Sequence, residues 1–187
     1  MNDVLVRAHE LIGRPVVTLH GDRVGAVKAD VLGLGDAVLV GFTLRNPGFL
    51  GGPRPETVPW ERVHAVGPDA VMIAERASLA GEDDVDAAGA REAVDVPVVT
   101  EGGERVGRVT DVVLATGLPC QVVGFEVEAA PSMPSAGEHL LMPMQAVTSA
   151  SEQAVVVPAG GQHFVQDDLA GFGAAVERFR SELEDRS

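Results

Sequence analysis

The sequence predicts an all-β protein of two small antiparallel barrels in tandem, followed by a short C-terminal helix. The first observation is an internal repeat: PVVTLHGDRVGAV starts at Pro15, and PVVTEGGERVGRV starts at Pro97, 97 − 15 = 82 residues later. The second is that each copy consists of short Val-rich runs between Gly, Asp and Pro turns, without a long helical period. Sheets this short leave exposed edges unless they curl and close, which favours barrels.

The first copy contains about six runs that are typical of strands. We expect them near residues 15–19, 23–32, 37–45, 56–59, 63–66 and 70–74. The match between the copies continues beyond the first hairpin, because VGF at 40–42 returns at 123–125 and Pro59 returns as Pro143. Gly21 and Gly103 each follow a strand and precede another, so we expect hairpin turns there, since glycine supplies positive φ without steric cost.

Two terminal segments have helical spacing. Near the N-terminus apolar residues recur between 4 and 12, although this segment is also compatible with an irregular arm that enters the barrel. At the other end, five apolar residues are spaced 3, 4, 3 and 4 apart: Leu169, Phe172, Val176, Phe179 and Leu183. This tail predicts an amphipathic helix that packs on the second barrel, with a seam for a partner or a second copy as the alternative.

Charge and composition separate the two halves. Residues 78–93 are small, acidic and poor in large apolar groups, so we expect a linker between a first domain at 1–77 and a second at 94–187. Residues 1–80 hold 8 Lys/Arg and 9 Asp/Glu, and residues 81–187 hold 6 and 19; the nets of −1 and −13 sum to the total of −14. No cluster of basic residues exists, which argues against direct nucleic-acid binding.

The remaining composition gives no indication of membrane insertion or catalysis. No apolar run reaches the roughly 20 residues of a membrane span, no secretion signal is recognisable, and Cys120 is the single cysteine, so we expect a cytoplasmic protein. The five histidines lie outside metal-ligand spacings, and no serine lies in a nucleophile elbow. We therefore expect no catalytic, metal or cofactor-binding residues, and no cofactor. Asp30 and Asp111 occupy similar positions in the two copies and are typical of turn or strand-end carboxylates.

Several segments together resemble the PRC-barrel family. In the first copy these are LIGRPVVTLHGDRVGAVKADVLGL, VGFTL and TVPWERVHAVGPDAVMI; in the second they are VPVVTEGGERVGRVTDVVLAT, VVGFEV and LLMPMQAVTSASEQAVVV. The family takes its name from the cytoplasmic domain of the photosynthetic reaction-centre H subunit, and a related barrel ends a bacterial ribosome maturation factor. The resemblance implies two PRC-like barrels and a binding or scaffolding role, with no catalytic residues to carry over.

Candidate partner-binding residues lie on loops and on the tail. The loop at 46–55 is rich in Pro and Gly yet contains two large apolar residues, a composition typical of recognition loops, although these side chains are also compatible with plugging the barrel. The corresponding loop of the second copy, at 129–135, offers one such residue. The candidates are Phe49, Leu50, Arg54, Met133, Phe172 and Phe179. Trp60, the single tryptophan, is expected in the core, with an interface anchor as the alternative.

Three functions remain open at this point. The leading hypothesis is a non-enzymatic protein-interaction or scaffolding module with a protein partner of unknown identity. The second is a ribosome-assembly factor that acts through a ribosomal protein. The third is a small-ligand sensor or enzyme with a cleft between the barrels. Homo-oligomer formation is compatible with all three.

Overall fold

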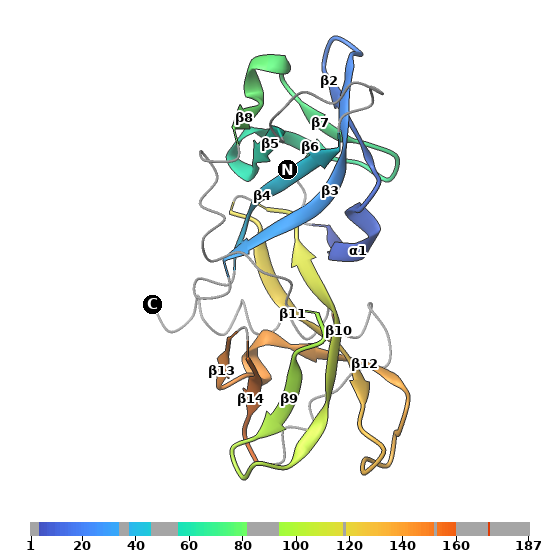
Figure 1. Cartoon of the computed structure of the whole chain (residues 1–187), viewed down its shortest axis with the longest axis vertical. Helices are drawn as coiled ribbons and strands as arrows, with labels where there is room; N and C mark the ends of the chain where they lie inside the picture. Colours follow the sequence, from blue (N-terminus) through green and yellow to red (C-terminus); the bar gives the residue numbers. More distant parts are fainter. Residues whose placement is uncertain are drawn as a thin grey trace. The chain divides into compact units, whose positions relative to one another are not determined.

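The computed structural model shows a mainly β chain that divides into two compact units (Figure 1). The structure describes residues 4–33, 38–45, 56–81, 94–117, 119–151, 153–159 and 172. The first unit comprises residues 1–92 together with residues 114–121, and the second comprises residues 93–113 and 122–187. Within the described part, the one α-helix whose bounds can be given is a single turn near the N-terminus, Ala8–Leu11.

The first unit is built around one curled sheet of mixed direction. Strand β2 pairs in parallel with β7 and antiparallel with β3; β7 pairs with β6, and β3 continues through β4 and β5 to β8. The elements are β1 (Leu5–Arg7), α1 (Ala8–Leu11), β2 (Pro15–Thr18), β3 (Arg23–Gly33), β4 (Val38–Arg45), β5 (Glu56–Pro59), η1 (Trp60–Arg62), β6 (Val63–Val66), β7 (Val71–Ile73), η2 (Arg76–Ser78) and β8 (Ala80–Gly81).

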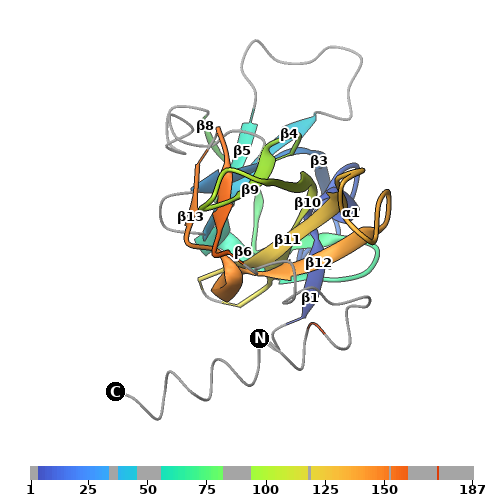
Figure 2. The same ribbon diagram turned by 90° about the horizontal axis from the view of Figure 1, so that it is seen from below.

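The second unit repeats this order of strands. Strand β9 pairs in parallel with β14 and antiparallel with β10, and β14 pairs with β13 (Figure 1). Strand β10 continues through β11 to β12 (Figure 2). The elements are β9 (Pro97–Thr100), β10 (Arg105–Ala115), β11 (Gln121–Ala129), β12 (His139–Pro143), η5 (Met144–Ala146), β13 (Ser149–Ala150) and β14 (Val155–Val157).

The two units also share the register of their strands. Val16 of β2 lies opposite Gly25 of β3, and Val98 of β9 lies opposite Gly107 of β10, at positions 82 residues further along (98 − 16 = 107 − 25). Both pairs shift register at the same place, next to the glycine. Because a slip of one residue would turn every side chain to the other face, this agreement means that the paired strands of both units point equivalent residues inward.

Both hairpins close with the same turn chemistry, as the sequence predicts. Gly21 and Gly103 have φ of 90° and 80°, a region that glycine occupies without a Cβ penalty. The buried hydroxyls of Thr18 and Thr100 each accept the backbone N–H of the residue four positions further on, at 3.1 Å. The threonines and glycines that recur in the sequence therefore recur because each turn requires them.

Each unit has its own apolar core. Inward-facing valines of the paired strands form most of it, and one or more phenylalanines fill its centre. The largest fully buried side chains of the first unit include Phe42, Leu11, Ile73, Val16, Val24, Val27, Val58, Val71 and, from the end of β10, Leu114; those of the second include Phe125, Phe172 and Met142. Trp60 is 4% exposed and lies edge-on to Phe42, with ring centroids 5.9 Å apart, which confirms the core position expected for it.

An unexpected feature is that residues 114–121, the tip of the β10–β11 hairpin, belong to the first unit. Trp60 Nε1 donates to the Gly117 carbonyl at 2.9 Å, and the Leu39 N–H donates to the Cys120 carbonyl at 2.9 Å. The Thr116 N–H and hydroxyl both donate to the Val4 carbonyl. The core of the first unit is thus completed by chain from beyond the expected linker.

Other boundaries differ from the sequence prediction. The N-terminal segment forms β1 and the one-turn helix α1 rather than a longer helix. Residues 78–81, assigned above to the linker, end η2 and form β8, which pairs with β5. The loop at 46–55, the rest of the linker and the tail apart from Phe172 lie outside the described residues.

Candidate functional site

The predicted contact residues that the structure describes are Met133 and Phe172. Met133 is half-buried in the loop between β11 and β12, and its N–H donates to the Ala130 carbonyl at 2.9 Å. Phe172 is fully buried: a Cβ added to Gly124 would lie 2.6 Å from its ring. The burial of Phe172 agrees with the packing role predicted for the tail, rather than with the alternative of a partner-binding seam, at this residue. Phe49, Leu50, Arg54 and Phe179 lie outside the described residues.

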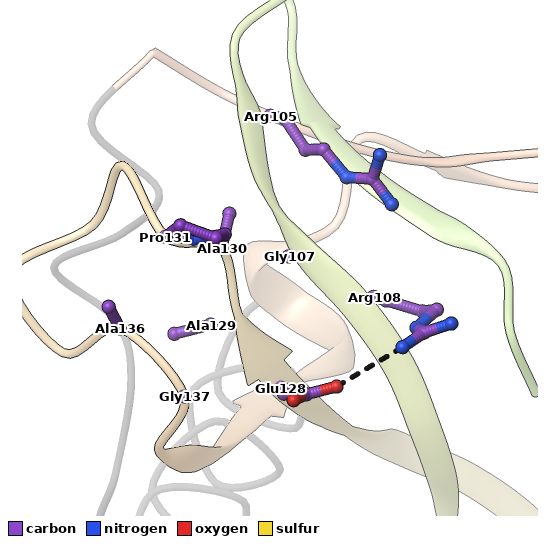
Figure 3. Close-up of a pocket in the computed structure, with 9 residues that line it drawn as sticks. All are labelled: Arg105, Gly107, Arg108, Glu128, Ala129, Ala130, Pro131, Ala136 and Gly137. Carbon is purple, nitrogen blue, oxygen red and sulfur yellow. Dashed lines mark hydrogen bonds and ion pairs between the residues drawn. The ribbon is translucent and has the colours of Figure 1, made fainter.

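A hollow of about 550 Å³ opens in the second unit beside the loop that contains Met133 (Figure 3). The start of β10 forms one wall, and the end of β11 with its following loop forms the other. Small side chains line most of the hollow, with two arginines and one glutamate among them: Arg105, Gly107, Arg108, Glu128, Ala129, Ala130, Pro131, Ala136 and Gly137.

The register shift at the start of β10 places Arg105 and Arg108 beside the same hollow. In a regular strand, residues three apart point to opposite faces. The irregularity between Arg105 and Gly107 adds one residue on this strand, and two successive buried residues, Val106 and Gly107, separate the two exposed arginines. Both guanidinium groups consequently lie to the same side of β10 in Figure 3.

The two arginines differ in their electrostatic surroundings. Arg108 forms ion pairs with Asp95 at 3.3 Å and with Glu128 at 3.3 Å. The guanidinium of Arg105 makes no hydrogen bond or ion pair with any residue in the described part of the chain. Among the described residues, Arg105 therefore has no ion-pair partner for its positive charge, and its N–H donors lie at the edge of the hollow.

The backbone holds the opposite wall in place. The Ala130 N–H donates to the Val106 carbonyl at 2.9 Å, and the Gly137 N–H donates to the Ala129 carbonyl at 3.1 Å. Gly107 allows β10 to approach β11 closely, because a Cβ there would collide with the Glu128 carbonyl. The hollow is thus formed by backbone that is already hydrogen-bonded.

His139, Glu126 and Thr110 of the second unit form a polar cluster, but they do not have the geometry of a catalytic acid–histidine–nucleophile relay. His139 Nδ1 lies 3.0 Å from Glu126 Oε1, and the same nitrogen lies 3.4 Å from Thr110 Oγ1. A relay requires the two imidazole nitrogens to serve the acid and the nucleophile separately. Here both contacts share one nitrogen, so the arrangement is a surface hydrogen-bond cluster.

Within the described ranges, no three His, Cys, Asp or Glu side chains lie close enough to hold a metal ion. No helix there is long and apolar enough to cross a membrane. Asp111 is buried, and its Oδ1 accepts the Val112 N–H at 2.8 Å, whereas Asp30 is half-buried in β3.

Sequence reasoning missed Arg105 as a site residue. A signal was available, because Arg105 is the equivalent of Arg23 in the first copy, in a repeat whose other identical residues are proline, valine, threonine and glycine. The register shift that brings Arg105 and Arg108 together is not visible in a residue pattern. The prediction that the loop after the third strand borders a binding surface remains a prediction, although the hollow adjoins that loop in the second unit.

Comparison with known families identifies part of the chain. Residues 3–80 match the model of the PRC-barrel domain family. The first part of the chain is therefore one PRC-barrel domain, as the sequence resemblance predicts for these residues. No curated protein matches the chain.

Proposed function

We propose that this chain, which begins with a PRC-barrel domain, is a non-enzymatic protein-interaction module built from two PRC-like barrels. The proposal assigns the second barrel to residues 94–187. It is supported by the strand order, register and turn chemistry that the two units have in common. A duplicated scaffold of this kind supplies two rigid supports for loops, and binding residues are common on loops held by rigid scaffolds.

The observation that carries the proposal is the hollow beside the β11–β12 loop. Its lining of alanines, proline and glycine offers apolar contact, and Arg105 offers a charge that has no ion-pair partner among the described residues. Such a surface can hold a partner but contains no residue pair arranged for proton transfer or nucleophilic attack. Binding is thus the activity that this geometry supports best.

A protein is the partner that the charge distribution favours. The chain has a net charge of −14, and residues 81–187 hold 19 of its 28 acidic residues. A polyanion such as nucleic acid would meet long-range repulsion over most of this surface. The first unit's loop at 46–55, with Phe49 and Leu50, provides a second candidate contact that differs in chemistry from the loop of the second unit.

Affinity capture followed by reconstitution tests the proposal. We would capture partners with the intact protein, identify them by mass spectrometry, and measure binding again with both proteins purified. The double variant Phe49→Ser, Leu50→Ser and the variant Met133→Ser probe the two loops. Leu19→Ser is the matched control, because Leu19 is a 54% exposed apolar residue on a hairpin turn.

The expected result is a purified partner whose affinity falls at least tenfold in a loop variant and is unchanged in Leu19→Ser. Equal binding by all variants would reject the loops as the contact surface. If no captured protein binds in purified form, the interaction-module proposal itself is rejected.

A further inference from the structure

We propose that the hollow beside β10 binds a short peptide segment bearing a single carboxylate, and that Arg105 receives this carboxylate. The inference rests on the proposed function, because it specifies the chemistry that one surface of the interaction module recognises. It assigns the partner a peptide whose charged group is isolated among neutral or basic residues.

Arg105 is the residue in the hollow that is free to bind an anion. Its guanidinium has no partner among the described residues, and it projects to the same side of β10 as Arg108 (Figure 3). A guanidinium presents parallel N–H donors that match the two oxygens of a carboxylate, and such charge-assisted pairs are stronger than neutral hydrogen bonds.

Arg108 has a different role, which is to complete the wall. Its charge is already offset by Asp95 and Glu128, each with one carboxylate oxygen at 3.3 Å. These ion pairs orient the Arg108 side chain across the hydrogen-bonded hairpin. We therefore expect Arg108 to form part of the wall of the hollow and Arg105 to attract the carboxylate of the peptide.

The surrounding charge limits the ligand to one anionic group. Glu128 lines the hollow, and the exposed residues Glu104 and Glu138 are adjacent in sequence to lining residues. A second or third negative charge on the ligand would lie near these carboxylates and be repelled, whereas a lysine flanking the ligand carboxylate would be attracted. This argument favours an isolated acidic residue over phosphorylated or acid-rich segments.

The neutral part of the hollow suits a peptide with small side chains. Ala129, Ala130, Pro131 and Ala136 line it, and its volume of about 550 Å³ lies in the ordinary range for ligand sites. A segment with alanine-sized residues beside its carboxylate would contact these side chains while the charge meets Arg105.

The test uses two defined peptides and the full-length protein. The probe is the hexapeptide KAAEAK, acetylated and amidated, and its control is KAAQAK, which has the same shape without the carboxylate. Binding is followed by amide chemical-shift changes in two-dimensional NMR spectra of isotope-labelled protein, which detect dissociation constants in the millimolar range. We expect the amides of Gly107, Ala130 and Gly137 to shift with KAAEAK and at least fivefold less with KAAQAK.

Protein variants then identify the receiving residue. Arg105→Gln should weaken KAAEAK binding at least fivefold while the remaining spectrum shows a retained fold. Arg23→Gln is the matched control, because Arg23 holds the equivalent exposed position in the first unit, and it should leave binding unchanged. Raising the salt concentration should weaken binding by wild type and have little effect on Arg105→Gln.

Three results would overturn the inference: no shifts at the hollow with KAAEAK, equal shifts with KAAQAK, or unchanged binding by Arg105→Gln. These failures are distinguishable from failure of the proposed function. A purified partner that depends on the loop at 46–55 would leave the interaction module in place while removing the carboxylate site from it.

Discussion

Replacing Trp60 with phenylalanine tests whether the hairpin tip at 114–121 stabilises the first unit. Trp60 is 4% exposed, and its Nε1 donates to the Gly117 carbonyl at 2.9 Å. The phenylalanine ring retains an aromatic surface for the edge-on contact with Phe42 but has no donor for the carbonyl. The substitution thus separates the hydrogen bond from most of the apolar packing.

The expected loss of stability follows from two contributions. Gly117 is buried, so its carbonyl loses its indole partner without free access to water, which costs about 1–3 kcal/mol. The smaller ring also leaves a partial void, and incomplete collapse around it adds about 1 kcal/mol. We expect Trp60→Phe to lower the free energy of unfolding by about 2–4 kcal/mol in total.

The assay is denaturation in guanidinium chloride followed by far-ultraviolet circular dichroism, since the variant lacks the chain's single tryptophan fluorophore. Met144→Leu serves as the control, because Met144 holds the equivalent position at the start of η5 in the second unit and is half-buried. A swap that conserves volume there should cost less than about 1.5 kcal/mol. A Trp60→Phe loss below about 0.5 kcal/mol would refute the reasoning that this hydrogen bond and its packing hold the tip.

Further predictions concern the tip, a close approach, the turns and an ion-pair cluster. A fragment of residues 1–92 retains the family match but lacks the tip, so we expect it to show no cooperative thermal unfolding; a sharp transition would contradict this. Gly124→Ala should destabilise the protein by about 2–3 kcal/mol in denaturant titrations, because the added Cβ would collide with a β12 carbonyl and the tail phenyl ring. Thr18→Ala and Thr100→Ala should each cost about 1–2 kcal/mol in the same assay, and very unequal losses would argue against equivalent turns. Arg108→Gln should change stability by less than about 1 kcal/mol, because its ion pairs are partly exposed; a larger loss would show that they are not solvent-screened.

The part of the fold that could be predicted from the sequence is the part that local chemistry fixes. A hairpin turn that needs positive φ favours glycine at one fixed position, and Gly21 and Gly103 occupy that position in the two copies. The valines on either side alternate because one face of each strand is buried. Two segments that repeat both features fold with the same register, so the repeat predicts the pairing of β2 with β3 and of β9 with β10.

The tip contacts and the hollow could not be predicted, because neither leaves a local pattern. Thr116, Gly117 and Cys120 look like an ordinary hairpin connection, and their burial depends on partners more than 50 residues away, such as Trp60. The hollow depends on an added residue in β10 that reverses the side-chain alternation, and sequence alone does not show where a strand is irregular. The tail illustrates a further limit: helical spacing does not distinguish a packing face from a binding face, and only the burial of Phe172 favours packing for that residue.

The differences between the two units would allow a partner of the proposed interaction module to distinguish one unit from the other. Arg108 stands where the first unit has Ala26, because both lie opposite the first residue of the preceding strand. Its partner Asp95 stands where the first unit has Gly13, and both of these residues have positive φ. Neither alanine nor glycine can form the ion pair. The charged wall that Arg108 and Asp95 provide in the second unit therefore has no equivalent at Ala26 and Gly13 of the first unit. The residues that the two units share thus specify a common backbone. The residues that differ give the second unit its own surface chemistry, and these positions would determine which partner the proposed module binds.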